Sequence, residues 1–312
     1  MENILISLNA VLPLFLIIGL GCIAKRLHIL SDEAARQANS LCFKLFMAPL
    51  LFYNVYGSDL ESALNGPLLA FCVIGTLAEF GIGLLLIPRV EPQRSAQGVM
   101  LQAFCRPNLV LLGLPVSISL FGEDNVGTIT FLLAVMVPLI NILAVLALEL
   151  FRGGTPEPRK ILRGVVQNPF VLGALAGFLC KFFHIQLPYI LETAVSDMAA
   201  AATPLALVLM GASLNFDKLQ GAGRSLTVCT VVRLLVSPAI FISLGAAMGF
   251  RGIALCAVML VFATPVAVNS YTMALQMDAD ADLAGGIVLL TTGFSCLTLF
   301  LWILLLKTLG LL

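Results

Sequence analysis

The sequence predicts an all-α polytopic membrane protein. Of its 312 residues, 60% are hydrophobic and 11% are charged, against roughly 25% charged residues in soluble domains. The mean hydropathy is +1.06, and the apolar residues fall in runs long enough to cross a bilayer as helices. A soluble fold of this size could not bury so much apolar surface. The net charge is zero, so nothing in the composition suggests a nucleic-acid partner.

Ten apolar runs are each expected to form one transmembrane helix. They lie at residues 4–24, 34–53, 67–88, 96–121, 126–150, 168–183, 188–213, 225–249, 252–276 and 283–308. Glycine, proline and charged residues separate the runs, as in the stretch 152–158. The first run is expected to be retained as a span, because Glu2 stands where a cleavable signal peptide carries basic residues.

Basic residues predict the orientation in the cell membrane. With alternate loops in the cytoplasm, eleven basic residues lie inside, namely Lys25, Arg26, Arg36, Arg89, Arg94, Arg152, Arg159, Lys160, Arg163, Lys218 and Arg224. Three lie outside, Lys181, Arg251 and Lys307. Under the positive-inside rule this distribution places both termini outside.

Proline-bearing segments indicate an internal duplication. Pro49 and Pro204 lie in similar pentapeptides 155 residues apart, and Pro107 and Pro265 are 158 residues apart. A unit of five helices crosses an odd number of times, so its second copy is inverted. We therefore predict two five-helix repeats, at 1–151 and 168–312, joined by a short cytoplasmic linker at 152–167.

Two of the predicted spans carry polar residues and prolines at corresponding depths. The fourth contains Arg106, Pro107, Asn108, Gly113 and Pro115, and the ninth contains Pro265, Asn269, Ser270 and Tyr271. A proline removes a backbone donor, so a broken helix presents free donors and acceptors to a ligand. Interrupted helices in inverted repeats are typical of transporters with a site near the midplane. The alternative is two proline kinks satisfied by nearby Ser and Thr hydroxyls.

Arg106 lies about ten residues into its span, roughly 15 Å deep at 1.5 Å per residue, and needs an anionic partner. Either a substrate carboxylate or Glu79 of the third span could supply it. Glu79 is a candidate for the coupling-ion site, or else forms a permanent ion pair with Arg106 or Arg233. For Arg233 itself we expect a structural charge that reaches the cytoplasmic headgroups.

Other chemistry finds little support in the residues. The eight cysteines are scattered singly through apolar runs, where they are expected to be packing residues, and we predict no cofactor and no metal site. The motifs of an embedded enzyme are absent from the sequence, which leaves three function classes. These are a transporter, a receptor that binds the same ligand without moving it, and a passive anion channel.

The polar segments of the two interrupted spans resemble those of the auxin efflux carrier family. The likeness covers essentially the whole chain and is most specific from Arg106 to Pro115, from Pro265 to Tyr271, and from Asp280 towards Trp302. It implies ten helices in two inverted repeats with crossed broken helices, where spans 1, 2, 6 and 7 form a scaffold and spans 3–5 and 8–10 a mobile transport domain. Ser270 departs from the plant members, which have a second proline at about this position.

From the residues and the resemblance together, we expect a secondary transporter of a small organic anion with an elevator-like motion. The substrate would be a carboxylate such as malate or malonate, or an auxin-like acid. Arg106 would bind the carboxylate, Asn108, Asn269, Ser270 and Tyr271 would add hydrogen bonds, and Pro49 and Pro204 would shape the opposing scaffold face. Coupling to a proton or to sodium, and assembly as a homodimer, are left open.

Overall fold

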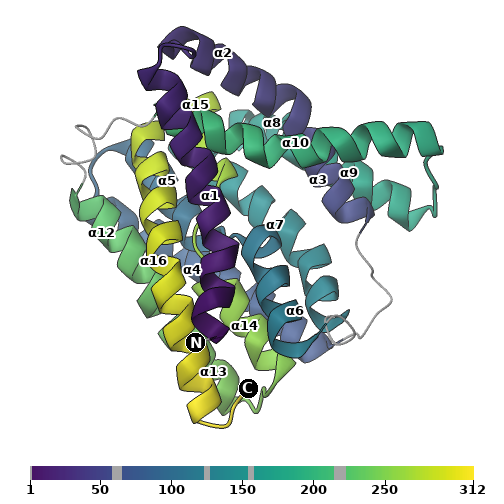
Figure 1. Cartoon of the computed structure of the whole chain (residues 1–312), viewed down its shortest axis with the longest axis vertical. Coiled ribbons are helices and arrows are strands. Elements are labelled where there is room, and N and C mark those ends of the chain that lie inside the picture. The colour runs from purple at the N-terminus through teal and green to yellow at the C-terminus, as the bar shows by residue number, and fades with distance from the viewer. Residues whose placement is uncertain (1, 58–64, 123–126, 154–157, 214–222) are drawn as a thin grey trace.

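The computed structural model describes residues 2–57, 65–122, 127–153, 158–213 and 223–312, and within these ranges the chain is helical apart from turns and a single isolated β-bridge (Figure 1). The first half contains α1 (Glu2–Arg26), α2 (Asp32–Leu41), the π-helical turn η1 (Cys42–Phe46), α3 (Met47–Tyr56), α4 (Gly66–Val90), α5 (Arg94–Cys105), the π-helical turn η2 (Leu109–Gly113), α6 (Leu114–Phe121) and α7 (Gly127–Phe151). The second half contains α8 (Pro158–Val166), α9 (Pro169–Phe182), α10 (Tyr189–Ser213), α12 (Gly223–Val231), the π-helical turn η4 (Val232–Val236), α13 (Ser237–Ala247), α14 (Ile253–Ala263), α15 (Asn269–Gln276) and α16 (Ala281–Thr308).

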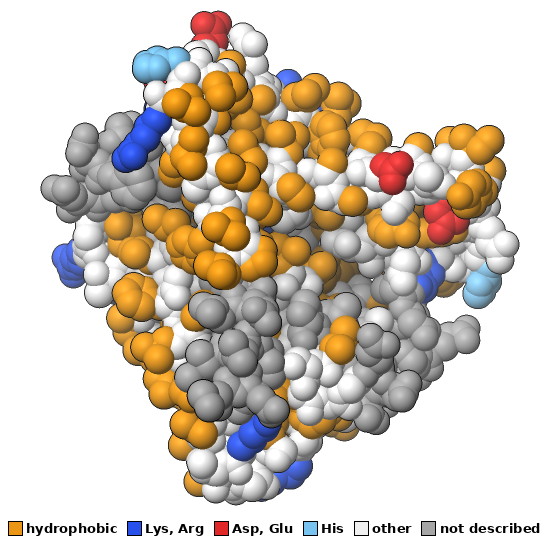
Figure 2. Space-filling model, in the orientation of Figure 1, with side chains coloured by type: hydrophobic (Ala, Val, Ile, Leu, Met, Phe, Trp, Pro, Cys, Tyr) orange, Lys and Arg blue, Asp and Glu red, His pale blue; other side chains and the backbone are white. Residues whose placement is uncertain are grey.

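Each predicted apolar run falls on one helix or on a series of consecutive helical segments. Among the described residues, five continuous helical stretches are long and apolar enough to cross a membrane, at 66–90, 128–151, 189–213, 223–247 and 281–308. Large hydrophobic side chains cover much of the surface that Figure 2 shows. Among the exposed leucines of the molecule, Leu16 and Leu85 are 62% and 66% exposed. This surface is that of a multi-pass membrane protein, because lipid and not water is the solvent that such side chains require.

Capping side chains explain where several helices begin. Ser31 Oγ accepts a hydrogen bond from the amide of Ala34, and Asn65 Oδ1 accepts one from Leu68. Asp280 does the same for α16 through the amide of Leu283, at 2.9 Å. Each cap satisfies a backbone donor that the first helical turn leaves free, a contribution of about 1 kcal/mol.

The segment predicted as a linker forms a helix of its own. In α8, Leu162 and Val166 lie four residues apart and are exposed, as is the basic Arg163. An amphipathic segment of this kind suits the boundary between the bilayer and water. It was expected as linker because it is too short and too basic to cross.

Four glycines allow two pairs of helices to approach closely. Gly21 of α1 and Gly211 of α10 each face the other helix's backbone, so that a Cβ on either would collide with it. Gly173 and Gly177 of α9 face the backbone of α3 in the same way. Figure 1 shows α3, α9 and α10 grouped together to one side of the molecule. In a membrane the hydrophobic effect does not drive helices together, because lipid tails are as apolar as the side chains. Small residues at the contact let the two backbones approach and gain van der Waals packing instead.

Candidate functional site

Both proline-bearing spans are interrupted at the predicted residues. Helix α5 ends at Cys105, directly before Arg106 and Pro107, and α14 ends at Ala263, two residues before Pro265. The two interruptions pair with each other through an antiparallel bridge between Pro107 and Val266. In this pairing the Asn108 amide donates to the Pro265 carbonyl at 2.8 Å, and the Ala267 amide donates to the Arg106 carbonyl at 3.1 Å. Backbone groups that the breaks release are thus partly satisfied by the opposite break.

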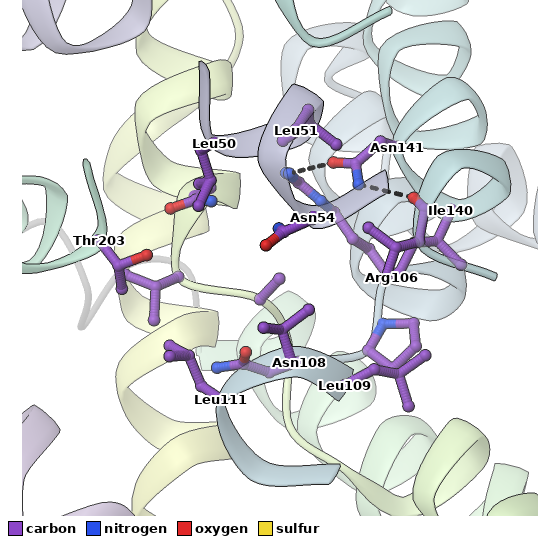
Figure 3. Close-up of a pocket in the computed structure, with 16 residues that line it drawn as sticks. Leu50, Leu51, Asn54, Arg106, Asn108, Leu109, Leu111, Ile140, Asn141 and Thr203 are labelled. Atoms are coloured by element: carbon purple, nitrogen blue, oxygen red, sulfur yellow. Dashed lines mark hydrogen bonds between the residues drawn. The ribbon is translucent and has the colours of Figure 1, made fainter. Parts of the chain in front are cut away.

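A cavity of about 70 Å³ lies beside this pairing. Its walls come from the Arg106–Leu111 and Ala267–Asn269 segments, from α7, from α3 and from Thr203 of α10. Figure 3 shows Asn54 and Asn108 on facing sides of it, with Arg106 and Asn141 along one wall and Thr203 opposite. The cavity exceeds the roughly 10–15 Å³ that one water molecule needs, and its amides and guanidinium make it a polar site.

Arg106 is the charged residue of this cavity, and its side chain is only 2% exposed. Its Nη2 donates to Asn141 Oδ1 at 2.8 Å, and its Nη1 contacts Ser270 Oγ at 3.3 Å and Met273 Sδ at 2.7 Å. The Phe170 ring lies against the guanidinium, with its centroid 5.3 Å from Cζ. Every one of these partners is uncharged.

Within the described ranges, no carboxylate forms an ion pair with Arg106. The sequence left Glu79 as one candidate, but Glu79 accepts a hydrogen bond from the Ser237 hydroxyl, and its Oε2 lies 4.0 Å from Nη1 of Arg233. A buried cation without a countercharge is costly, and an anion bound in this cavity would offset that cost.

Arg233 lies elsewhere than predicted. It was expected to reach the cytoplasmic headgroups, whereas its side chain is 0% exposed. The guanidinium donates to the carbonyls of Phe104, Val261 and Thr264. These carbonyls belong to the C-terminal ends of α5 and α14, and their partial negative charge explains why the arginine points inward.

Two amides at the breaks have unused hydrogen-bonding atoms. Asn108 Nδ2 and Asn269 Oδ1 are buried without a partner in the described part of the chain, and both residues line the cavity. Leaving such an atom unpaired costs about 1–3 kcal/mol. One donor and one acceptor are therefore available to a ligand next to the Arg106 guanidinium.

A second, larger cavity adjoins the first. It measures about 400 Å³ and shares with it Leu50, Asn54, Val110, Leu111 and Thr203. Its remaining lining comes from α1, α3 and α10 and is mostly apolar, with Tyr53 and Ser196 as further polar residues. The two cavities are therefore neighbours, one beside a buried guanidinium and the other lined mostly by apolar side chains.

The predicted site residues divide into two groups. The first cavity is lined by Arg106, Pro107, Asn108 and Asn269. Ser270 contacts Arg106, and the Pro265 carbonyl accepts a hydrogen bond from the amide of Asn108. Of the others, Pro204 lines the adjoining cavity, and Gly113 lines neither cavity but packs against Leu109 and Leu260. Pro49 lies on α3 outside the lining of either cavity, and the side chain of Pro115 is outside the described part.

Tyr271 faces a different space. It lines a third cavity of about 290 Å³ together with Lys25, Asp32, Arg36 and Asp282, at the end of the molecule predicted to be cytoplasmic. Lys25 Nζ lies 2.6 Å from Asp32 Oδ1, and this ammonium holds the pKa of Asp32 below its ordinary value. Although Tyr271 immediately follows Ser270, the helical turn of α15 directs it away from Arg106.

Three polar residues that line the first cavity were missed by sequence reasoning, namely Asn54, Asn141 and Thr203. Asn141 had a usable signal, since it is an isolated amide in the apolar helix α7. Asn54 and Thr203 lie on α3 and α10, where the sequence signal was the pair of prolines Pro49 and Pro204. Only the packing of these two helices brings Asn54 and Thr203 to the cavity.

Comparison with known proteins places the chain among membrane transporters. The pattern of the family described as membrane transport protein matches residues 6–303. An "Uncharacterized transporter" of Methanothermobacter thermautotrophicus is 26% identical over 297 residues, which cover 95% of this chain and 97% of the relative. A second one, of Methanocaldococcus jannaschii, is 22% identical over 96% of this chain and 98% of the relative. A "Putative malonate transporter" of Rhizobium meliloti is 24% identical over 92% of each chain. With the family pattern spanning nearly the whole sequence, the chain belongs to the membrane transport protein family, that of the auxin efflux carriers its interrupted spans resemble.

Proposed function

We propose that the protein is a secondary active transporter of a small organic anion, and that the carboxylate of the substrate binds Arg106. The observation that carries this proposal is a guanidinium 2% exposed at a cavity wall, with only uncharged partners in the described chain. A carboxylate matches the planar donor array of arginine. Asn108 and Asn269 offer the donor and the acceptor for the rest of the ligand's polar groups.

The charge of the side chains that line the cavities indicates how many carboxylates the substrate carries. Among the described residues that line the two adjoining cavities, Arg106 is the sole cation, and the larger cavity is mainly apolar. A second carboxylate would find amides and hydroxyls but no second cation. The lining therefore favours an acid with one ionised carboxylate and an uncharged remainder. Malonate, named for one relative, is the dicarboxylate to test against it.

The position of the cavity supports an elevator-like motion of a transport domain against a scaffold, in a protein of ten spans that form two inverted repeats. Its lining comes partly from α3 and α10, in the proposed scaffold, and partly from α5, η2, α7 and the 265–269 segment, in the proposed transport domain. Ser237 and Glu79, which bond to each other, are 158 residues apart, the same offset that separates Pro107 from Pro265. This agreement favours a duplicated unit whose interrupted helices cross. The positive-inside assignment places both termini outside.

Glu79 is the residue we propose for coupling, to a proton or to Na⁺. It is a buried acid in the middle of α4, and through Arg233 it is linked to the carbonyl ends of both interrupted helices. Binding or loss of a cation there would alter the charge balance next to the breaks that carry the substrate site.

The direct test is exchange in liposomes that contain only this chain. Vesicles loaded with unlabelled acid should take up the same acid in labelled form by counterflow, in a saturable manner. A panel of monocarboxylates, including an auxin, and dicarboxylates, including malonate and malate, ranks the classes. The Arg106→Gln variant should exchange none of them. Flux that rises without saturation would instead indicate a channel, and binding without exchange would indicate a receptor.

A further inference from the structure

The second buried arginine, Arg233, has a different environment from Arg106. Its Nε donates to the carbonyl of Thr264 at 2.8 Å, its Nη1 to that of Phe104 at 3.0 Å, and its Nη2 to that of Val261 at 2.6 Å. Thus all three guanidinium nitrogens bind backbone oxygens. Two of these oxygens belong to the ninth predicted span and one to the fourth, so a single side chain bridges the two interrupted helices.

The sequence explains why those oxygens are free. In a continuous helix the Val261 carbonyl would accept from the amide four residues later, but that residue is Pro265, which has no N–H. The Phe104 carbonyl would accept from the amide of Asn108, which donates to Pro265 instead. The ends of α5 and α14 also carry partial negative charge. Together they form a site of backbone oxygens suited to a cation.

We propose that Arg233 is a tethered cation that occupies the place where transporters with broken helices hold a coupling Na⁺, so that this protein neither binds nor requires Na⁺. Such transporters coordinate their ion with freed carbonyls at the break, and here the guanidinium takes three of them. The inference rests on the proposed function, because it decides between the two coupling ions considered there, in favour of the proton.

The surroundings of Arg233 are consistent with a permanent occupant. Glu79 Oε2, 4.0 Å away, is the carboxylate that faces it, and Ser237 holds the other oxygen of Glu79. When Glu79 is ionised its charge balances that of Arg233, and Na⁺ would have to displace a covalently attached group that makes three hydrogen bonds. The same bonds also fix the two breaks against each other, since Phe104 lies two residues before Arg106 and Thr264 directly precedes Pro265.

The test uses the melting temperature of the full chain in detergent, without substrate, so that its result is independent of whether a carboxylate is transported. For the wild type, titrating Na⁺ against choline at constant ionic strength should leave the melting temperature unchanged. Arg233→Ala should melt at a lower temperature, and millimolar guanidinium should restore part of the loss. Arg251→Ala, which removes an exposed arginine that also donates to carbonyls, should show no such recovery.

Two results would overturn the proposal. One is a saturable, Na⁺-specific rise in the melting temperature of the wild type, and the other is an Arg233→Ala protein that guanidinium does not stabilise. If the alanine variant does not fold, Arg233→Lys takes its place. The single ammonium of lysine cannot reach three separated acceptors. The Arg233→Lys protein should therefore melt at a lower temperature than the wild type, and Na⁺ should not change its melting temperature. A melting temperature above that of the wild type, independent of Na⁺, would contradict the bridging role.

Discussion

The amide of Asn108 donates a hydrogen bond to the carbonyl of Pro265 at 2.8 Å, and this bond joins the two interrupted helices. It makes the backbone of one break part of the structure of the other. The side chains that follow, Arg106 and Asn108 from the first break and Asn269 from the second, therefore reach one cavity from separate halves of the sequence. A change at either break should affect the same ligand site.

Asn141 should orient the Arg106 guanidinium for substrate. Replacing it by Leu removes the acceptor at 2.8 Å from Nη2, and a lost hydrogen bond to a charged group should raise the substrate Kd about tenfold. Asn141→Asp should weaken binding further, because its carboxylate would compete with that of the substrate. Titration calorimetry with the best acid of the panel measures both. Ile142→Leu, at the next and partly exposed residue, serves as the control, and equal Kd values in all four proteins would show that Asn141 has no role.

Glu79→Gln should abolish gradient-driven accumulation of the substrate and preserve exchange. Exchange needs only the loaded carrier to reorient, whereas accumulation needs a group that binds and releases the coupling ion, which an amide cannot do. Both rates are measured in the same liposomes, with and without an imposed pH gradient. Glu33→Gln, at an exposed acid in the first turn of α2, should retain accumulation. Normal accumulation in Glu79→Gln would remove Glu79 from the coupling role.

Gly21→Ala should destabilise the contact between α1 and α10. The added methyl would meet the backbone at Val208 and Ala212, and overpacking of this kind costs about 1–3 kcal/mol. Gly19→Ala, on the same helix, meets nothing within 4 Å and should match the wild type or exceed it slightly, since alanine favours helix. Thermal unfolding in detergent compares the two, and equal melting temperatures would mean that the helices are farther apart than described.

How far the sequence predicts the fold depends on the type of signal. Apolar run length and proline position are local properties, and they correctly located the helices and the interruptions at Pro107 and Pro265. Arg106 was singled out because a charge so deep in an apolar run is itself the signal. The structure places it at the wall of the cavity, and its binding role stays a prediction. The helix α8 was missed, because nine residues of mixed polarity carry no spanning signal.

Long-range contacts account for the remaining differences. Arg233 was predicted to reach the membrane surface because it lies near the cytoplasmic end of its predicted span. It is buried instead because it binds carbonyls released by Pro265 and by the Asn108 bond, on two other helices. Tyr271 was grouped with Ser270 by adjacency, although successive residues on a helix point about 100° apart. Asn54 and Thr203 reach the cavity only through packing between α3, α10 and the breaks.

The central claim is that Arg106 binds the carboxylate of the substrate, and ligand-induced stabilisation of purified protein tests it most directly. At about 100 times its Kd, a ligand should stabilise the wild type by roughly 2.7 kcal/mol. We expect one class of acid to do so, Arg106→Lys to retain part of the effect, and Arg106→Gln to lose it while remaining folded. Equal stabilisation of wild type and Arg106→Gln by the same acid would contradict the claim and place the binding site elsewhere.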